Sequence, residues 1–306
     1  IGRGDGATPA PGGWVPPASV VGGVGATPVF VDVDRQTRNI DLARVEAAIT
    51  PRTRALIPVD LAGLPVDRDR LAALAGKHRL RVIEDAAQSF GGRWAGREIG
   101  SFGDLVCFSF HANKNITTSE GGCLVVNNDE EASRLERLRL QGVERLAGGE
   151  MEVESWGAKA NLTDVAAAIG LGQLRQAQDF TFARRALAER YYARWDPSLD
   201  FELPPRQAAP AEGNWHMFQP LLPARLASRR GDFITAMREQ GIGVGVHYPA
   251  MHLFSLFRER GWTRGDFPVA EDIGARIVTL PLFPAMRPSD VDRVCRAVQA
   301  AACALH

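Results

Sequence analysis

The sequence predicts an α/β fold in which a mainly parallel central sheet is followed by a smaller C-terminal α/β unit. Short β-type runs alternate with helical patterns over residues 28–126, which implies right-handed crossovers and helices on both faces of the sheet. A loop-like stretch at residues 197–214 then leads into a second series of elements. Since 306 residues exceed what one hydrophobic core usually holds, we expect a large domain over residues 1–180 and a small one over 181–306.

The elements of the large domain follow from local composition and hydrophobic spacing. Residues 1–28 hold eight glycines and five prolines, so we expect a loop or an irregular edge there. Apolar runs predict strands, in chain order, at residues 28–32, 55–59, 81–84, 105–110 and 122–126. Helical spacing predicts helices at residues 41–49, with Asp41 as N-cap, at 67–79 and 129–140, and one long helix over 161–195.

The small domain is predicted to contain a strand at residues 216–222, a helix at 232–240 and an extended segment that ends in His247-Tyr248-Pro249. A closing helix follows, for which we predict Ser289 as the N-cap, with Asp292 three residues later. The apolar face of this helix is formed by Val291, Val294, Cys295 and Val298.

Composition excludes several classes of function. The 36 basic residues balance 36 acidic ones, which argues against a nucleic-acid partner. No apolar run approaches the roughly 18 residues that a membrane span needs, so we expect no membrane partner. The four cysteines show no CxxC spacing, so neither a metal site nor a disulfide framework is predicted, and a reducing cytoplasm is the simplest location.

Lysine is rare in this chain, because only Lys77, Lys114 and Lys159 among the 36 basic residues are lysine. Lys114 lies in the polar loop that follows the predicted strand at residues 105–110. A primary amine beyond a strand end forms a Schiff base with an aldehyde cofactor, which a guanidinium cannot do. The alternative is an ordinary solvated surface lysine.

Asp85 directly follows the predicted strand at residues 81–84. Ligands of open α/β sheets bind beyond the carboxyl ends of the strands, so we expect the Asp85 carboxylate to face such a crevice. The alternative is a capping aspartate that starts the next turn.

Several segments, in this order along almost the whole chain, resemble the DegT/StrS family of pyridoxal-phosphate-dependent sugar aminotransferases. These segments are residues 25–34, 84–89, 109–117, 120–122, 161–164, 245–249 and 280–284. The resemblance implies the aspartate aminotransferase-like PLP-transferase fold, fold type I. The wording His-Ala-Asn-Lys-Asn-Ile-Thr and Leu-Pro-Leu-Phe-Pro is similar to that of C4 aminotransferases of nucleotide-linked ketosugars.

The resemblance also implies roles for individual residues. Lys114 would hold pyridoxal 5'-phosphate as a Schiff base and move the proton during transfer of the amino group from glutamate or a similar donor. Asp85 would lie against the pyridine nitrogen and Gln88 would bind the phenolic oxygen. Ser109 would bind the phosphate, and Asn161 would reach the phosphate of a neighbouring subunit, which implies a homodimer with shared sites.

Four further residues match family positions. Trp14 aligns with an aromatic residue that stacks on the cofactor ring, and a packing tryptophan is the alternative. His216, His247 and Tyr248 are similar to positions near the substrate or the dimer contact. For these three the alternative is a hydrogen-bonded structural group.

The resemblance fails at the start of the chain. Family members carry roughly sixty more residues before this point, including a Gly-Thr helix N-terminus that cups the cofactor phosphate. We expect such a segment to precede the present sequence; the alternative is a non-catalytic relative or scaffold with an incomplete phosphate cup. A sugar dehydratase of the same family is a lesser alternative, because those relatives have histidine where Lys114 stands. The glycines at residues 22–25 lack the flanking strand and helix of a nucleotide-binding oxidoreductase.

Overall fold

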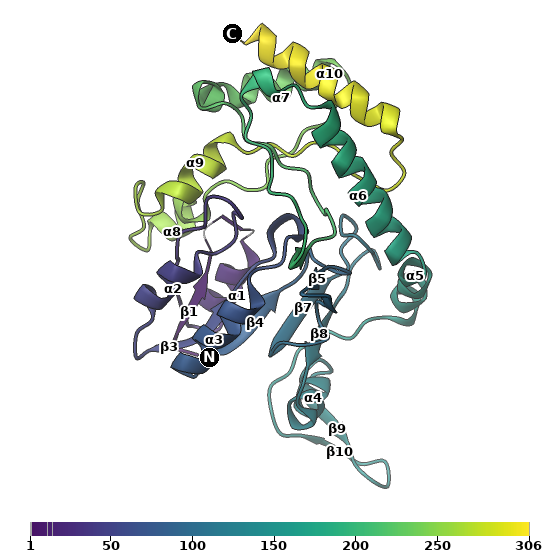
Figure 1. Cartoon of the computed structure of the whole chain (residues 1–306). Coiled ribbons are helices and arrows are strands. Elements are labelled where there is room, and N and C mark those ends of the chain that lie inside the picture. The colour runs from purple at the N-terminus through teal and green to yellow at the C-terminus, as the bar shows by residue number, and fades with distance from the viewer. Residues whose placement is uncertain (1, 11, 14, 306) are drawn as a thin grey trace.

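The protein is built around a six-stranded sheet with the strand order β2-β1-β3-β4-β7-β8. A computed structural model describes residues 2–10, 12–13 and 15–305 (Figure 1). The pairs among β2, β1, β3, β4 and β7 are parallel, and β8 runs antiparallel to β7 at the edge. The strands are β1 (Gly6–Pro9), β2 (Thr27–Pro28), β3 (Thr53–Ile57), β4 (Arg81–Asp85), β7 (Leu105–Ser109) and β8 (Gly122–Val126). The predicted α/β fold with a mainly parallel central sheet is therefore confirmed.

Helices cover both faces of this sheet because successive strand residues point to opposite faces. Val82 of β4 packs in one core with α2 (Leu42–Ala48) and α3 (Arg68–His78). The next residue, Ile83, packs in a second core with α1 (Pro16–Gly23). Both α2 and α3 begin where the sequence predicts. At the start of α2, Asp41 accepts a hydrogen bond from the amide of Ala43 at 2.9 Å. At the start of α3, Asp67 accepts a hydrogen bond from the amide of Arg70 at 3.0 Å.

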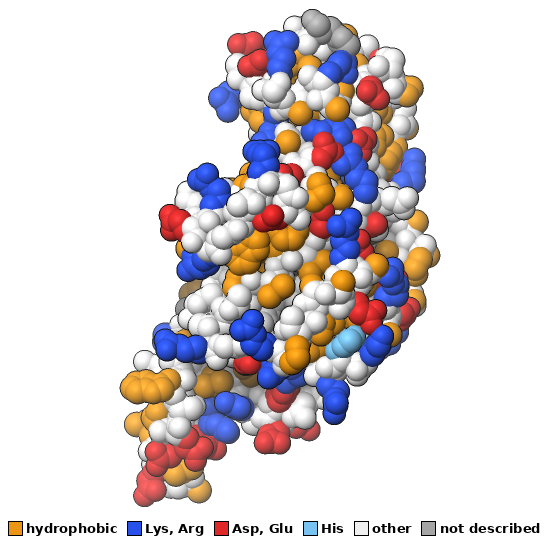
Figure 2. Space-filling view, turned by 90° about the vertical axis from the view of Figure 1, so that its left-hand side faces the viewer, with side chains coloured by type: hydrophobic (Ala, Val, Ile, Leu, Met, Phe, Trp, Pro, Cys, Tyr) orange, Lys and Arg blue, Asp and Glu red, His pale blue; other side chains and the backbone are white. Residues whose placement is uncertain are grey.

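Two small antiparallel sheets flank the central one. β5 (Arg93–Trp94) pairs with β6 (Arg97–Glu98) and with β11 (Ala211–Glu212). β9 (Val143–Arg145) and β10 (Met151–Val153) form a hairpin that projects with α4 (Asp129–Leu138) from one end of the molecule (Figure 1). Figure 2 shows this projection at the lower end of the molecule, with acidic side chains gathered near its tip.

The C-terminal part has its own hydrophobic core. Its long helices are α6 (Ala177–Arg194), α7 (Arg230–Glu239) and α10 (Pro288–Ala304), with the shorter α8 (Ser255–Arg258) and α9 (Pro268–Arg276) nearer the sheet (Figure 1). Tyr191 stacks on Phe218 with ring centroids 4.5 Å apart, and both side chains are fully buried in this core. The domain boundary at residue 180 stays a prediction.

The start of the chain differs from the expected loop. β1 is the second strand of the sheet and pairs with both β2 and β3, and Ala7 and Thr8 are buried. The segment is thus a strand because it pairs with strands on both sides and its side chains are buried, despite its glycine and proline content. Pro16 at the first position of α1 is compatible with a helix, because the missing amide hydrogen has no intrahelical partner there.

Three further predictions are corrected. The expected single helix over residues 161–195 is broken between α5 (Asp164–Leu174) and α6. The closing helix starts one residue before Ser289, because Pro288 occupies its first turn and Asp290, rather than Asp292, accepts a hydrogen bond from the amide of Arg287 at 2.8 Å. The segment 216–222 makes only isolated bridges to Glu202 and to residues 277–280, since its buried side chains serve the C-terminal core without a continuous ladder.

Candidate active site

A cavity of about 840 Å³ opens at the carboxyl ends of β4 and β7. Its walls come from both strands, from the loop after β7, from α1 and from residues 246–248. This is the position at which open α/β sheets bind ligands, because the loops that leave the strands diverge there. Asp85, Gln88, Ser109, Lys114, His247 and Tyr248 all line this cavity.

Asp85 and Lys114 reach the cavity from neighbouring strands. Asp85 is the last residue of β4 and pairs in parallel register with Cys107 of β7, seven residues before Lys114. The Asp85 carboxylate accepts a hydrogen bond from the amide of Ala87 at 3.1 Å, so it starts the following turn and also faces the cavity. Both interpretations of Asp85 from the sequence therefore describe the same side chain.

The two groups also influence each other electrostatically. Burial lowers the pKa of the Lys114 amine, and the Asp85 carboxylate acts in the opposite direction. Burial raises the pKa of Asp85, against the hydrogen bond from Ala87 and the charge of Lys114. Within the described part of the chain, no side-chain hydrogen bond or ion pair within contact distance holds the Lys114 amine. Lys77 instead pairs with Glu46 and Lys159 with Asn161, so Lys114 alone among the lysines enters this cavity.

Gln88 is buried and held from three sides. Its Oε1 accepts a hydrogen bond from the amide of Ala62 at 2.7 Å, and its Nε2 lies 3.4 Å from the hydroxyl of Tyr248. Asn214 donates from its Nδ2 to the carbonyl of Gln88 at 2.8 Å. Gly63 makes this close packing possible, because a Cβ there would lie 1.9 Å from Asn214 Oδ1 and φ is +86°.

The remaining predicted residues of the C-terminal part approach the same region. His247 Nδ1 lies 2.8 Å from Thr279 Oγ1. Burial lowers the pKa of His247, and the charge of Lys114 lowers it further to a smaller extent. Burial raises the pKa of Tyr248 to about 12, so its hydroxyl stays protonated at neutral pH. His216 is buried behind the cavity wall, and burial holds its pKa well below the ordinary value, with a smaller contribution from Lys114.

Neither Asn161 nor His216 is among the residues that line the cavity. Asn161 lines a separate groove of about 490 Å³ between the loop after β7 and α5. Its Oδ1 accepts a hydrogen bond from Lys159 Nζ at 2.6 Å. Trp14 lies outside the residues that the structure describes. Ser109, by contrast, lies in the cavity, and its hydroxyl accepts a hydrogen bond from the amide of His111 at 3.3 Å.

Sequence reasoning missed a buried ion-pair network behind β4. One nitrogen of Arg68, Nη2, lies 2.6 Å from Asp60 and 2.9 Å from Glu84. Ser89 Oγ also donates to Asp60 at 2.6 Å. Burial raises the pKa of Glu84 to about 7, although Arg68 acts against this. The only sequence signal was the pair of adjacent carboxylates at residues 84 and 85, which face opposite sides of the sheet.

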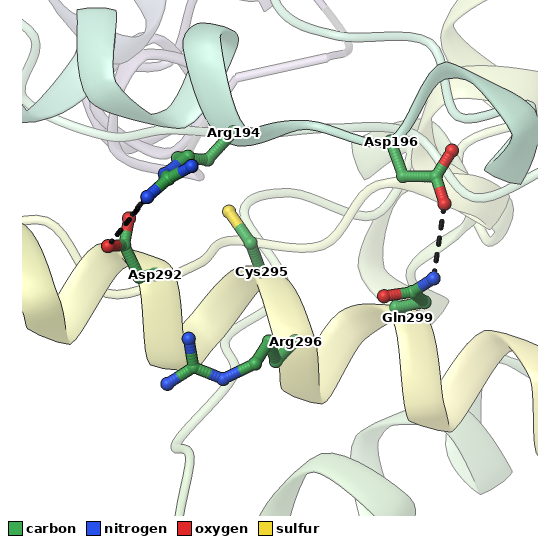
Figure 3. Close-up of a pocket in the computed structure, with 6 residues that line it drawn as sticks. All are labelled: Arg194, Asp196, Asp292, Cys295, Arg296 and Gln299. Carbon is green, nitrogen blue, oxygen red and sulfur yellow. Dashed lines mark hydrogen bonds and ion pairs between the residues drawn. The ribbon is translucent and has the colours of Figure 1, made fainter.

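A second cavity, of about 220 Å³, lies between α6 and α10 (Figure 3). Two pairs of its lining groups bind each other: Arg194 contacts Asp292 at 3.1 Å and Gln299 donates to Asp196 at 3.2 Å. Burial raises the pKa of the Cys295 thiol to about 11, so the reactive thiolate is scarce at neutral pH. The side-chain contacts in this cavity therefore connect α6 to α10, and none of its lining groups is activated for catalysis.

Comparisons with known proteins agree with the geometry. The model of the DegT/DnrJ/EryC1/StrS aminotransferase family matches residues 1–299. The uncharacterized protein MJ1066 of Methanocaldococcus jannaschii is 39% identical over 284 residues, which are 90% of this chain and 73% of that relative.

Two solved structures are also similar to this chain. The putative sugar aminotransferase Spr1654 of Streptococcus pneumoniae, in its PMP form, matches with a TM-score of 0.95 and 27% identity, over 100% of this chain and 84% of that one. DesV of S. venezuelae, in complex with a ketimine intermediate, matches with a TM-score of 0.91 and 33% identity, over 99% of this chain and 79% of that one. None of the described helices is both long and apolar enough to cross a bilayer. The chain belongs to the DegT/DnrJ/EryC1/StrS family of aminotransferases, which depend on pyridoxal 5'-phosphate.

Proposed function

We propose that the cavity beyond β4 and β7 is the active site of this sugar aminotransferase. In this proposal an amino group passes from glutamate or a similar donor to C4 of a nucleotide-linked ketosugar. The observation that carries the proposal is the placement of the Asp85 carboxylate and the Lys114 amine in one cavity of about 840 Å³. A volume of this size accommodates a cofactor together with the sugar part of a substrate.

The groups that line the cavity fit pyridoxal phosphate. Lys114 offers the amine that binds an aldehyde, Asp85 offers a carboxylate for a protonated ring nitrogen, and Gln88 offers an amide for the phenolic oxygen. The Ser109 hydroxyl is a ligand for the phosphate. When bound, the cofactor supplies an aldehyde that carries the amino group and a ring that withdraws electrons from the reacting carbon.

The environment of Lys114 suits an amine that both binds and transfers protons. Because burial lowers its pKa, a larger fraction of the amine is neutral at physiological pH than in an exposed lysine. The neutral amine would accept a proton from the substrate carbon, and the resulting ammonium would deliver it to C4′ of the bound cofactor. Asp85 lines the same cavity, where its carboxylate would pair with a protonated ring nitrogen.

His247 and Tyr248 are our candidates for the sugar contacts. Both line the cavity, and both carry groups that bind hydroxyls: an imidazole held by Thr279 and a phenol that is protonated at neutral pH. The role of Trp14 on the cofactor ring stays a prediction.

We also propose that the enzyme is a homodimer whose partner covers α5. All residues of this helix except Asp164 and Gln173 are apolar or glycine, yet Val165 is 74% exposed and Leu171 59% exposed. Such helices are normally buried. Asn161 lies beside α5 in a groove of its own, which supports a role toward a second copy. Val165→Asp should shift the protein to monomers in sedimentation velocity; dimers of unchanged affinity would refute this contact.

The experiment that tests the catalytic assignment compares Lys114→Ala with Lys77→Ala. Lys77 lies on α3, away from the cavity, and pairs with Glu46. After loading with pyridoxal phosphate, the Lys77 variant should show the visible absorbance band of the wild type, and the Lys114 variant should lose that band and turnover together. A band and turnover retained in the Lys114 variant would overturn the assignment.

The substrate is tested in the pyridoxamine-loaded protein. Candidate 4-ketosugars linked to different nucleotides are mixed in turn with this form. A substrate restores the visible band within a single turnover, whereas a sugar with the ketone at another carbon should not. Restoration by 3-ketosugars alone would contradict the C4 assignment.

A further inference from the structure

A buried hydrogen bond joins the residue after Lys114 to the C-terminal part of the chain. Asn115 Oδ1 lies 2.7 Å from His216 Nδ1, and both side chains are at least nine-tenths buried. These residues are 101 positions apart in the sequence. The bond therefore connects the loop that carries the candidate catalytic lysine to a segment beyond α6.

The neighbouring groups determine which atom of this bond is the donor. Asn115 Nδ2 donates to the main-chain carbonyl of Asn214 at 3.5 Å, so the Oδ1 of Asn115 faces the imidazole ring. An amide oxygen only accepts, and His216 must then carry its proton on Nδ1. Because burial holds the pKa of His216 well below its ordinary value, the ring stays neutral in this single tautomer.

The segment that carries His216 is itself held firmly. The buried Arg184 of α6 donates from Nη1 to the carbonyls of Trp215 at 3.3 Å, His216 at 3.1 Å and Leu282 at 2.8 Å. The amide of His216 also donates to Asn214 Oδ1 at 3.0 Å. His216 thus has a fixed main chain on one side and donates to Asn115 on the other.

We propose that His216 is a positioning residue for Lys114. Its Nδ1–H holds the side chain of Asn115, which fixes the peptide next to the lysine and so fixes where the amine enters the cavity. This inference rests on the proposed role of Lys114. The longer hydrogen bond from Asn115 Nδ2 to the carbonyl of Asn214, at 3.5 Å, links the same side chain to the C-terminal part. The hydrogen bond from the amide of Lys114 to the carbonyl of His111, at 2.9 Å, lies within the loop.

The test separates the hydrogen bond from simple packing. His216→Phe fills the space but cannot donate, whereas His216→Gln offers an amide donor to Asn115. Asn115→Ala removes the acceptor, together with the hydrogen bond from Asn115 Nδ2 to the carbonyl of Asn214. The matched control is His252→Phe, because His252 is also fully buried and hydrogen-bonded, to Glu271 at 3.0 Å, but lies outside the cavity wall. Thermal unfolding establishes that each variant is folded.

The first measurement uses the protein without cofactor. Reductive methylation of Lys114 is followed against pH by peptide mass spectrometry, with Lys77 and Lys159, the only other lysines, as internal references. In His216→Phe and Asn115→Ala the pH midpoint for Lys114 should rise by at least about half a unit, because the released amine moves toward water. His216→Gln and His252→Phe should keep the wild-type midpoint.

The second measurement is steady-state kinetics of the loaded enzyme. Misplacement of a reacting group mainly affects the chemical step, so His216→Phe should lower kcat about ten-fold or more with KM changed less than about two-fold. His216→Gln should restore kcat to within about three-fold of the wild type.

A folded His216→Phe with unchanged Lys114 methylation and kcat would overturn the proposal, and so would an equal effect in His252→Phe. If His216→Phe does not fold, Asn115→Ala decides by the same criteria. Failure of the underlying assignment is recognised separately, because it would appear as a Lys114→Ala variant that keeps the visible band.

Discussion

Replacing Gly63 by alanine should destabilise the protein strongly and loosen Gln88. Gly63 has φ of +86°, a conformation that costs a residue with a Cβ about 1–2 kcal/mol. The new Cβ would also lie 1.9 Å from Asn214 Oδ1, so Asn214 must move. That movement breaks its hydrogen bonds to the carbonyls of Gln88 at 2.8 Å and Phe90 at 2.9 Å. Leaving buried partners unpaired adds about 1–3 kcal/mol, and we expect a total loss of about 2–5 kcal/mol in the free energy of unfolding.

Urea unfolding of Gly63→Ala measures this loss, and Gly76→Ala is the matched control. A Cβ on Gly76, inside α3, would meet no atom within 4 Å, so alanine there should stabilise the helix by about 0.5–1 kcal/mol. Affinity for pyridoxal phosphate should fall in Gly63→Ala only. A loss smaller than about 1 kcal/mol in Gly63→Ala would refute the reasoning, because even the backbone conformation alone costs that much.

Three other outcomes follow from buried groups. Burial raises the pKa of Glu84 from 4.5 to about 7, so the folded protein holds a proton that the unfolded chain releases, and the free energy of unfolding falls as the pH rises between these values. Glu84→Gln should flatten this fall by up to about 3 kcal/mol, measured by urea unfolding at pH 5 and pH 8; an unchanged slope would contradict the shift. Burial likewise raises the pKa of Cys107 to about 11, so iodoacetamide at pH 8 should modify the exposed Cys303 first, as mass spectrometry can establish; faster modification of Cys107 would count against it. Tyr191→Phe should lower the free energy of unfolding by about 1–3 kcal/mol, because the carbonyl of Pro281 loses its 2.7 Å hydrogen bond. An unchanged midpoint of thermal unfolding would show that this bond contributes nothing to stability.

The parts of the site that lie at strand ends could be predicted from the sequence because their signals are local. A carboxylate directly after an apolar run and a rare lysine after the next buried run are both visible in the chain itself. The parallel pairing of β4 with β7 then brings Asp85 and Lys114 to one cavity, as the alternation of strands and helices predicts. The helix that begins after Asp41 was predictable for the same reason.

The features that sequence reasoning missed depend on contacts between distant segments. β1 has the composition of a loop and becomes a strand because β2 and β3 pair with it from both sides. Asn115 and His216 lie 101 residues apart, and neither residue type nor spacing indicates that they meet. The break between α5 and α6 likewise interrupts a continuous apolar pattern without a proline, and only Gly170 and Gly172 precede it.

The Asp85 carboxylate and the Lys114 amine are attached to different kinds of backbone, and this difference bears on how substrate preference could evolve or be redesigned. Asp85 belongs to a strand whose main chain is hydrogen-bonded to neighbours on both sides, which restrains its position. Lys114 extends from a loop beyond the ladder. In the role proposed for Lys114, substitutions around that loop would change the position of the amine relative to Asp85, which is a route to new acceptors that leaves the sheet unchanged.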